Sequence, residues 1–203
     1  RGIGIGKNSR ASHQDVIVIG TSANANSINA ISIGANSFSG GDASIVLGKS
    51  ALSASGADDT ICIGHGAITT SSADRSIVIG KDAVSSFTDS IAIGHAAEVA
   101  ASANNSIAIG NTALVNTSSA DGIAIGRVSK AQAVNAIAIG LGNNTSGVNS
   151  LIVGGGNTIN TGAYDGILLG VISIINANCF RSIVIGYNSL SAAINSICIG
   201  ENA

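Results

Sequence analysis

The sequence Ser-Ile-Val-Ile-Gly at residues 76–80 returns as Ser-Ile-Ala-Ile-Gly at residues 90–94 and again at residues 106–110. Two aliphatic residues, separated by one residue and followed by glycine, recur in this way along the whole 203-residue chain. We call the final glycine of each copy the landmark glycine: Gly6, Gly20, Gly34, Gly48, Gly64, Gly80, Gly94, Gly110, Gly126, Gly140, Gly154, Gly170, Gly186 and Gly200. Successive landmarks are 14 or 16 residues apart. Because side chains alternate along a strand, insertions of two residues keep the same face buried, so even spacing indicates a β repeat.

Positions in each copy are numbered from the landmark glycine. Positions −3 and −1 hold Ile, Leu or Val in every copy, and position −2 never holds a charged residue. The strand is therefore expected to be buried on both faces. Position −5 is mostly Asp or Asn, which favour turns. A coil of 14 or 16 residues with a strand, a glycine turn and a second, weaker strand predicts an all-β, flat parallel β-solenoid with turns about 4.8 Å apart.

The aliphatic pair at positions −3 and −1 is expected to fill the interior of the coil. A coil this thin cannot cover both faces of its first strand, so another copy of the same chain is expected to cover position −2. Which face meets the symmetry axis stays open at this point. The predicted coil core contains Ile77, Ile79, Ile91, Ile93, Ile107, Ile109, Ile123, Ile125, Ile137 and Ile139, and the predicted partner-facing residues are Ala92, Ala108, Ala124 and Ala138.

Three consecutive copies carry Asp59, Arg75 and Asp89 at position −5. Stacked turns would place these side chains above one another and form an Asp–Arg–Asp ladder along the turn edge. Exposed ion pairs contribute little to stability, so we expect this ladder to set the register between turns.

Composition and motifs exclude several function classes. The chain is 10% charged with a formal net charge of −2, which gives no electrostatic footprint for nucleic acid or an anionic membrane. The longest apolar stretch is too short to span a bilayer, so no membrane insertion by this segment is expected. No catalytic triad, paired carboxylates, cofactor motif or metal-ligand cluster is visible, so we expect no enzyme, no cofactor and no metal.

The three cysteines have no common site. Cys62 and Cys198 both occupy position −2 but lie nine coils apart, too far for a disulfide within the chain. Cys179 falls in a predicted loop. They are interpreted as small buried residues, with a functional thiol or an interchain bridge as the alternative.

Other polar and aromatic residues are candidates for contact with a partner. A partly basic row at position +1 is interpreted as a solvated turn row, with a ligand-binding stripe as the alternative; it contains Lys7, Lys49, His65, Lys81, His95 and Arg127. The most exposed candidates for binding are the loop of Asn116, Thr117, Ser118 and Ser119 and the aromatic residues Phe38, Phe87, Tyr164, Phe180 and Tyr187.

The Ser-Ile-Ala-Ile-Gly cores, each followed by a small residue three places later, resemble the head repeat of YadA-like trimeric autotransporter adhesins over Ile3 to Ala203. The resemblance implies a left-handed parallel β-roll, packed closely as a homotrimer. Residues 1–203 are then one repeat array, expected to be a fragment of a longer fibre protein.

The same resemblance implies a function in attachment. We expect a trimeric, extracellular fibre segment that binds a bacterial surface to host cells, matrix or other cells through a protein or glycan receptor. The bacterial protein would be held at the outer membrane by further segments. Similar repeats occur in viral and phage fibres, so a tail-fibre segment of a virion is one alternative; a structural stalk that carries a separate binding tip is another.

Overall fold

The computed structural model describes all residues from Arg1 to Ala203, and every regular element in it is a β-strand. The chain divides into two compact units, Arg1–Ala100 and Ala101–Ala203. No segment forms a helix long and apolar enough to cross a membrane.

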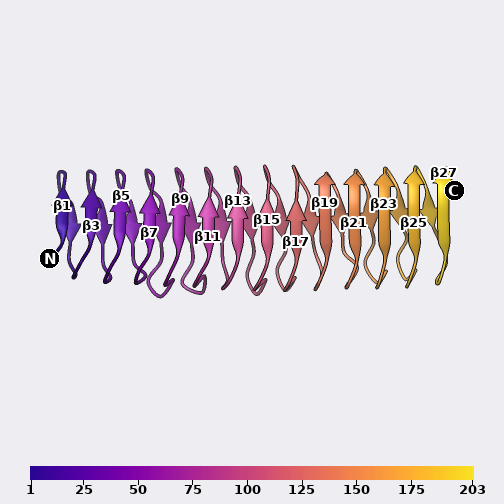
Figure 1. The fold of residues 1–203 in the computed structure, drawn as a ribbon, viewed down its shortest axis with the longest axis horizontal. Coiled ribbons are helices and arrows are strands. Elements are labelled where there is room, and N and C mark those ends of the chain that lie inside the picture. Colours follow the sequence, from indigo (N-terminus) through magenta and orange to yellow (C-terminus); the bar gives the residue numbers. More distant parts are fainter. The chain divides into compact units, whose positions relative to one another are not determined.

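In the first unit, each turn of the chain adds one strand to each of two parallel sheets (Figure 1). The first sheet contains β1 (Ile3–Ile5), β3 (Ile17–Ile19), β5 (Ile31–Ile33), β7 (Ile45–Leu47), β9 (Ile61–Ile63), β11 (Ile77–Ile79) and β13 (Ile91–Ile93). The second contains β2 (Arg10–Ala11), β4 (Asn24–Ala25), β6 (Phe38–Ser39), β8 (Leu52–Ser53), β10 (Ile68–Thr69), β12 (Val84–Ser85) and β14 (Glu98–Val99). Val78 pairs with Ala92, its equivalent in the next copy.

The second unit repeats this plan, and from residue 137 onward the strands of its first sheet have five residues rather than three. Its first sheet contains β15 (Ile107–Ile109), β17 (Ile123–Ile125), β19 (Ile137–Leu141), β21 (Leu151–Gly155), β23 (Ile167–Val171), β25 (Ile183–Tyr187) and β27 (Ile197–Glu201). Its second sheet contains β16 (Leu114–Val115), β18 (Lys130–Ala131), β20 (Asn144–Thr145), β22 (Thr158–Ile159), β24 (Ile174–Ile175) and β26 (Leu190–Ser191). The parallel β-solenoid predicted from the even spacing is therefore the architecture of both units.

The turns explain the residue preferences at position −5. Asp59 and Asn105 there have φ of 57° and 54°, in the left-handed region that Asp and Asn tolerate better than other side chains. The landmark glycines have a different requirement. Gly110 has φ of 137°, and a Cβ on it would lie 2.5 Å from the carbonyl oxygen of Gly126, the next landmark. Adjacent turns therefore approach too closely for any side chain at the landmark.

Burial reverses the two faces that the sequence analysis assigned to the first-sheet strands. Ala92, Ala108, Ala124 and Ala138 point into the coil and have no exposed surface, so they cannot face a partner chain. The predicted core residues Ile77, Ile79, Ile91, Ile93, Ile107, Ile109, Ile123, Ile125, Ile137 and Ile139 lie on the outside and are partly exposed. Ile79, for example, keeps 36% of its surface exposed. The two predicted sets have thus exchanged sides: the isoleucines lie outside the coil and the alanines inside it.

The narrow coil interior is the physical reason for this exchange. Position +5 of the second sheet and position −4 face each other across the coil. Where Val115 fills the first, the second is Gly122, on which a Cβ would lie 2.8 Å from Val115 Cγ1. Where both residues are small and polar, as in Ser85 and Ser90, their hydroxyls hydrogen-bond at 2.5 Å. With positions −4 and −2 facing inward, alternation places positions −3 and −1 outward, and the inward position −2 is a small residue in most copies but Ile152 and Leu168 in the second unit.

Candidate functional site

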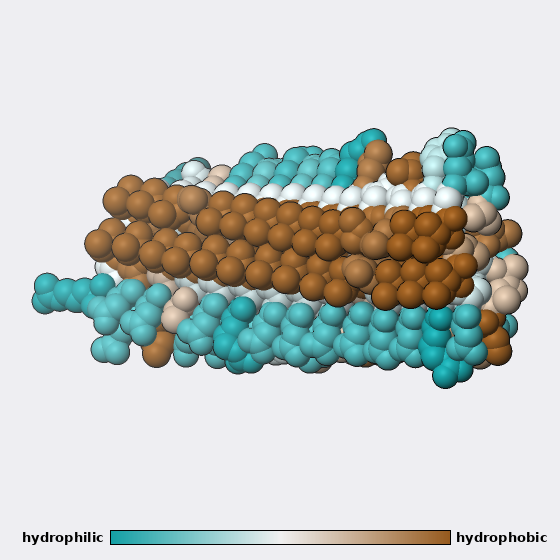
Figure 2. All heavy atoms as spheres, turned by 45° about the vertical axis from the view of Figure 1, so that its right-hand side comes forward, coloured by the Kyte–Doolittle hydropathy of each residue, from teal (hydrophilic) through white to brown (hydrophobic).

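The outward side chains at positions −3 and −1 form what we call the isoleucine face of each unit. Figure 2 shows these apolar residues as continuous rows bordered by hydrophilic turn residues. Exposure is 39% for Ile45 and 43% for Leu47 in the first unit, and 38% for Val153 and 37% for Ile185 in the second. Apolar patches that run over many residues and are rimmed by polar ones mark interaction sites. The isoleucine face is therefore the principal candidate surface of the chain.

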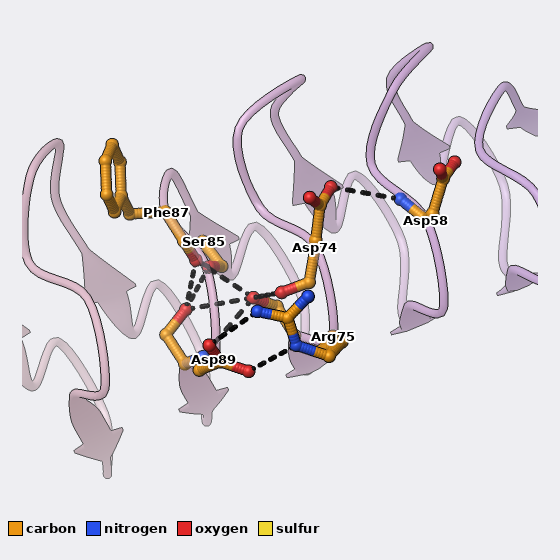
Figure 3. A network of polar contacts seen from close by, with 8 residues as sticks. Asp58, Asp74, Arg75, Ser85, Phe87 and Asp89 are labelled. Carbon is orange, nitrogen blue, oxygen red and sulfur yellow. Dashed lines mark hydrogen bonds and ion pairs between the residues drawn. The ribbon is translucent and has the colours of Figure 1, made fainter.

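One half of the Asp–Arg–Asp ladder forms an ion pair. Arg75 donates from Nε and Nη2 to the two carboxylate oxygens of Asp89, each at 2.7 Å (Figure 3). This hydrogen bonding, with the Arg75 charge, holds the pKa of Asp89 below its ordinary value. The same bonds to Asp89 raise the pKa of Arg75, and the charges of Asp74 and Asp59 add to the effect. Asp59 forms no ion pair with Arg75, so the ladder has two members.

A second acidic row lies beside this pair at position −6, and the sequence analysis missed it. The Asp58 backbone nitrogen donates to Asp74 Oδ1 at 3.3 Å, as Figure 3 shows, and the Asp42 nitrogen donates to Asp58 Oδ1 at 2.8 Å. Each carboxylate thus accepts from the preceding turn. The recurrence of Asp at one position in three consecutive copies was the available signal.

The partly basic row at position +1 is exposed on the turn edge. Within it, Lys81 Nζ lies 3.0 Å from Asp82 Oδ2. That hydrogen bond, and the charges of Lys81, His65 and His95, lower the pKa of Asp82. The pairing neutralises part of the positive charge of this edge.

The candidate binding residues divide between surface and interior. Thr117 and Ser118 are exposed, but Ser119 is buried, which corrects the prediction that the whole loop is exposed. Phe38 and Phe87 are half-buried, and Tyr187 is exposed at the end of β25. Tyr164 and Phe180 stack on each other, with ring centroids 5.8 Å apart and planes 8° apart.

The cysteines are all free. Cys62 is buried, which raises the pKa of its thiol to about 11. Cys179 lies outside the strands, as predicted, and is buried, and Cys198 is partly exposed. No group of three or more His, Cys, Asp or Glu side chains is arranged to hold a metal ion.

A buried polar ladder in the second unit is formed by Asn143 and Asn157, which stand where most other copies have a small residue three places after the landmark glycine. Asn157 Nδ2 donates to the Gly170 carbonyl at 2.6 Å, and Asn157 Oδ1 accepts from the Ser173 backbone nitrogen at 2.9 Å. Asn143 Oδ1 in turn accepts from the Asn157 backbone nitrogen at 3.0 Å. These amides hold successive turns in register inside the coil.

The repeats identify the family. The YadA head domain repeat matches residues 17–37, 71–97, 100–113, 118–143, 131–151 and 180–203, which together cover more than half of the chain. The chain therefore belongs to the YadA head repeat family. No curated protein matches it.

Proposed function

We propose that residues 1–203 form one β-roll array that packs as a closely associated, left-handed homotrimer and acts as an adhesive segment of an extracellular fibre. The observation that carries the trimer is the isoleucine face, which a single chain leaves partly exposed along both units. Heads of the YadA family are in general trimeric and belong to surface-exposed fibres.

Burial energetics support self-association. Complete burial of an isoleucine side chain is worth about 1.5–3 kcal/mol. The isoleucine face carries two such side chains in every turn, so covering even part of it provides a large driving force. A copy of the same chain has the same turn spacing and an equally long apolar face, which matches this surface turn for turn.

The role in attachment rests on family membership. The segment is proposed to bind a bacterial surface to host cells, matrix or other cells through a host-surface protein or glycan, and to be non-enzymatic. With a net charge of −2, nucleic acid is not a proposed partner.

A viral or phage tail fibre is the second candidate, and the free cysteines favour it. Three unpaired thiols suit assembly in a reducing compartment better than export to the cell surface. A purely structural stalk would share the fold but would not bind by itself.

Attachment is tested with beads that carry the isolated chain in its associated form, added to cell layers and to immobilised matrix proteins. The proposal predicts retention of these beads above that of beads carrying the heat-unfolded chain. Equal retention, together with attachment by a longer form of the protein, would contradict the adhesive role and favour the stalk.

A further inference from the structure

Two neighbouring turns of the second unit carry aromatic residues at position −6, which holds no aromatic residue in the other copies. Tyr164 lies between β22 and β23, and Phe180 lies between β24 and β25. Nearly parallel rings with centroids 5.8 Å apart are offset from each other, so part of each ring face stays uncovered. Tyr164 keeps 46% of its surface exposed. This edge therefore presents a flat apolar surface to solvent.

A charged residue follows each ring. Asp165 Oδ1 accepts a hydrogen bond from Asn149 Nδ2 at 3.1 Å, which leaves its second oxygen without a donor in the chain. Arg181 is exposed, and its guanidinium forms no hydrogen bond or ion pair within the chain. The edge thus combines a free cation, a free carboxylate oxygen and an aromatic surface.

Arg75 occupies the same position in the first unit, but its guanidinium has a partner within the chain. Both arginines occupy position −5, and each is followed 14 residues later by the equivalent residue of the next turn. For Arg75 that residue is Asp89, which binds the guanidinium through both oxygens (Figure 3). For Arg181 it is Asn195, which carries no charge. The sequence therefore leaves Arg181 available for an anionic group from outside.

A shallow cavity joins these four side chains. It measures about 270 Å³ and is lined by Tyr164, Asp165, Phe180 and Arg181. A water molecule occupies about 30 Å³ in the liquid, so the cavity accommodates a group of the size of one sugar ring.

We propose that Tyr164, Asp165, Phe180 and Arg181 form a binding subsite for one carboxylate-bearing sugar unit of a surface glycan. The guanidinium pairs with the sugar carboxylate, for which its planar, charge-assisted donors are suited. Asp165 accepts from a sugar hydroxyl, and the offset rings contact the apolar face of the sugar. The inference rests on the proposed function, because it names a receptor chemistry for the adhesive segment.

Direct binding of defined saccharides to the associated wild-type chain tests the subsite. The probes are sialyllactose, a glucuronate-containing hyaluronan fragment and neutral lactose, followed by NMR line broadening and titration. We expect at least one acidic probe to bind tenfold or more tightly than lactose, and the first two probes separate a sialic acid from a uronic acid. No binding of either acidic probe, or equal binding of lactose, would overturn the proposal.

Three variants and one control variant assign the binding to this site. Arg181→Gln and Phe180→Ala are expected to weaken acidic-probe binding at least tenfold, whereas Arg75→Gln, at the same position in the first unit, leaves it unchanged. Asn195→Asp removes no lining residue but supplies Arg181 with a partner in the register of Asp89, and it should also weaken binding. Unchanged binding in Arg181→Gln, or equal loss in Arg75→Gln, contradicts the assignment.

The cell-attachment assay separates this inference from the proposed function. If wild-type beads attach but neither Arg181→Gln nor free acidic saccharide reduces attachment, the adhesive role stands and the subsite is not its receptor site. If the chain binds the acidic probe but beads do not attach, the subsite stands and the adhesive role fails. Dissociation of the associated chains by Arg181→Gln would show that this edge is a subunit contact and would overturn the subsite.

Discussion

Glycine at the landmark position is required for two separate reasons at Gly110. Its φ of 137° is strained for any residue with a Cβ, and the added atom would meet the Gly126 carbonyl at 2.5 Å. Gly110→Ala should therefore destabilise the fold by about 1–3 kcal/mol in urea unfolding. Gly155→Ala is the control, because the nearest atom to its added Cβ is 3.8 Å away. Equal effects of both substitutions would contradict the close approach of adjacent turns.

Thiol reactivity should follow burial. Only the thiolate reacts, and burial raises the pKa of Cys62 to about 11, so at pH 8 this thiol stays protonated. With a chromogenic disulfide reagent at pH 8, we expect the partly exposed Cys198 to react first. Cys62 and Cys179 should react only after denaturant is added. Rapid reaction of Cys62 in the native protein would show that the coil opens or that the cysteine lies outside it.

Position +5 offers a matched pair of buried hydroxyls in consecutive turns. Thr69 Oγ1 has no hydrogen-bond partner, whereas Ser85 Oγ bonds to the Ser90 hydroxyl and to the Phe87 carbonyl. Thr69→Val should therefore leave stability unchanged or raise it, and Ser85→Ala should lower it by about 1 kcal/mol. Chemical denaturation of the two variants measures this difference. A loss for Thr69→Val as large as that for Ser85→Ala would contradict it.

At the scale of the strand and its turns, the amide ladder of the second unit should contribute measurably to the free energy of unfolding. Asn157→Ala would leave the Gly170 carbonyl and the Ser173 backbone nitrogen without their bonds to the side chain. Unsatisfied buried groups cost about 1–3 kcal/mol, so we expect a loss of that size in the free energy of unfolding. The control is Asn160→Ala in the same turn, where Asn160 uses only its backbone in hydrogen bonds. A loss no larger than that of the control would contradict the ladder.

The strands and their pairing could be predicted from the sequence, because even spacing and aliphatic doublets constrain a β repeat strongly. The inward face could not, since positions −3, −2 and −1 are all apolar in most copies. In most copies position −2 holds the smaller residue, such as Ala92 or Val78, and this residue faces the coil interior, although the second unit also buries Ile152 and Leu168 there. The Arg75–Asp89 pair could be predicted, because both residues occupy position −5 and adjacent turns stack on each other. Asp59 did not join it, because register fixes only which positions are neighbours and not which rotamer each side chain adopts.

The Tyr164 and Phe180 edge illustrates a second limit. The sequence marks both aromatics as exposed candidates, but only the structure stacks them and leaves Arg181 without a partner beside them. The signal was present in Asn195, which replaces the acidic residue found after Arg75. The difference between Asn195 and Asp89 indicates an unpaired arginine only when each is known to lie next to its arginine in the adjacent turn.

At the scale of the whole molecule, the corrected orientation predicts which substitutions disrupt association. The double variant Ile107→Asn and Ile109→Asn places amides on the isoleucine face and should shift the proposed trimer towards single chains. Leu114→Asn changes an outward residue of the second sheet and should leave association intact. Light scattering of both variants measures the outcome. Dissociation by Leu114→Asn alone would move the interface to the second sheet.

The central claim is that copies of this chain cover one another's isoleucine faces, and sedimentation equilibrium of the wild-type chain tests it most directly. The account predicts a mass of three chains that persists on dilution to low micromolar concentration. A stable, soluble particle with the mass of one chain would contradict it, because the isoleucine face would then remain exposed to water without a partner.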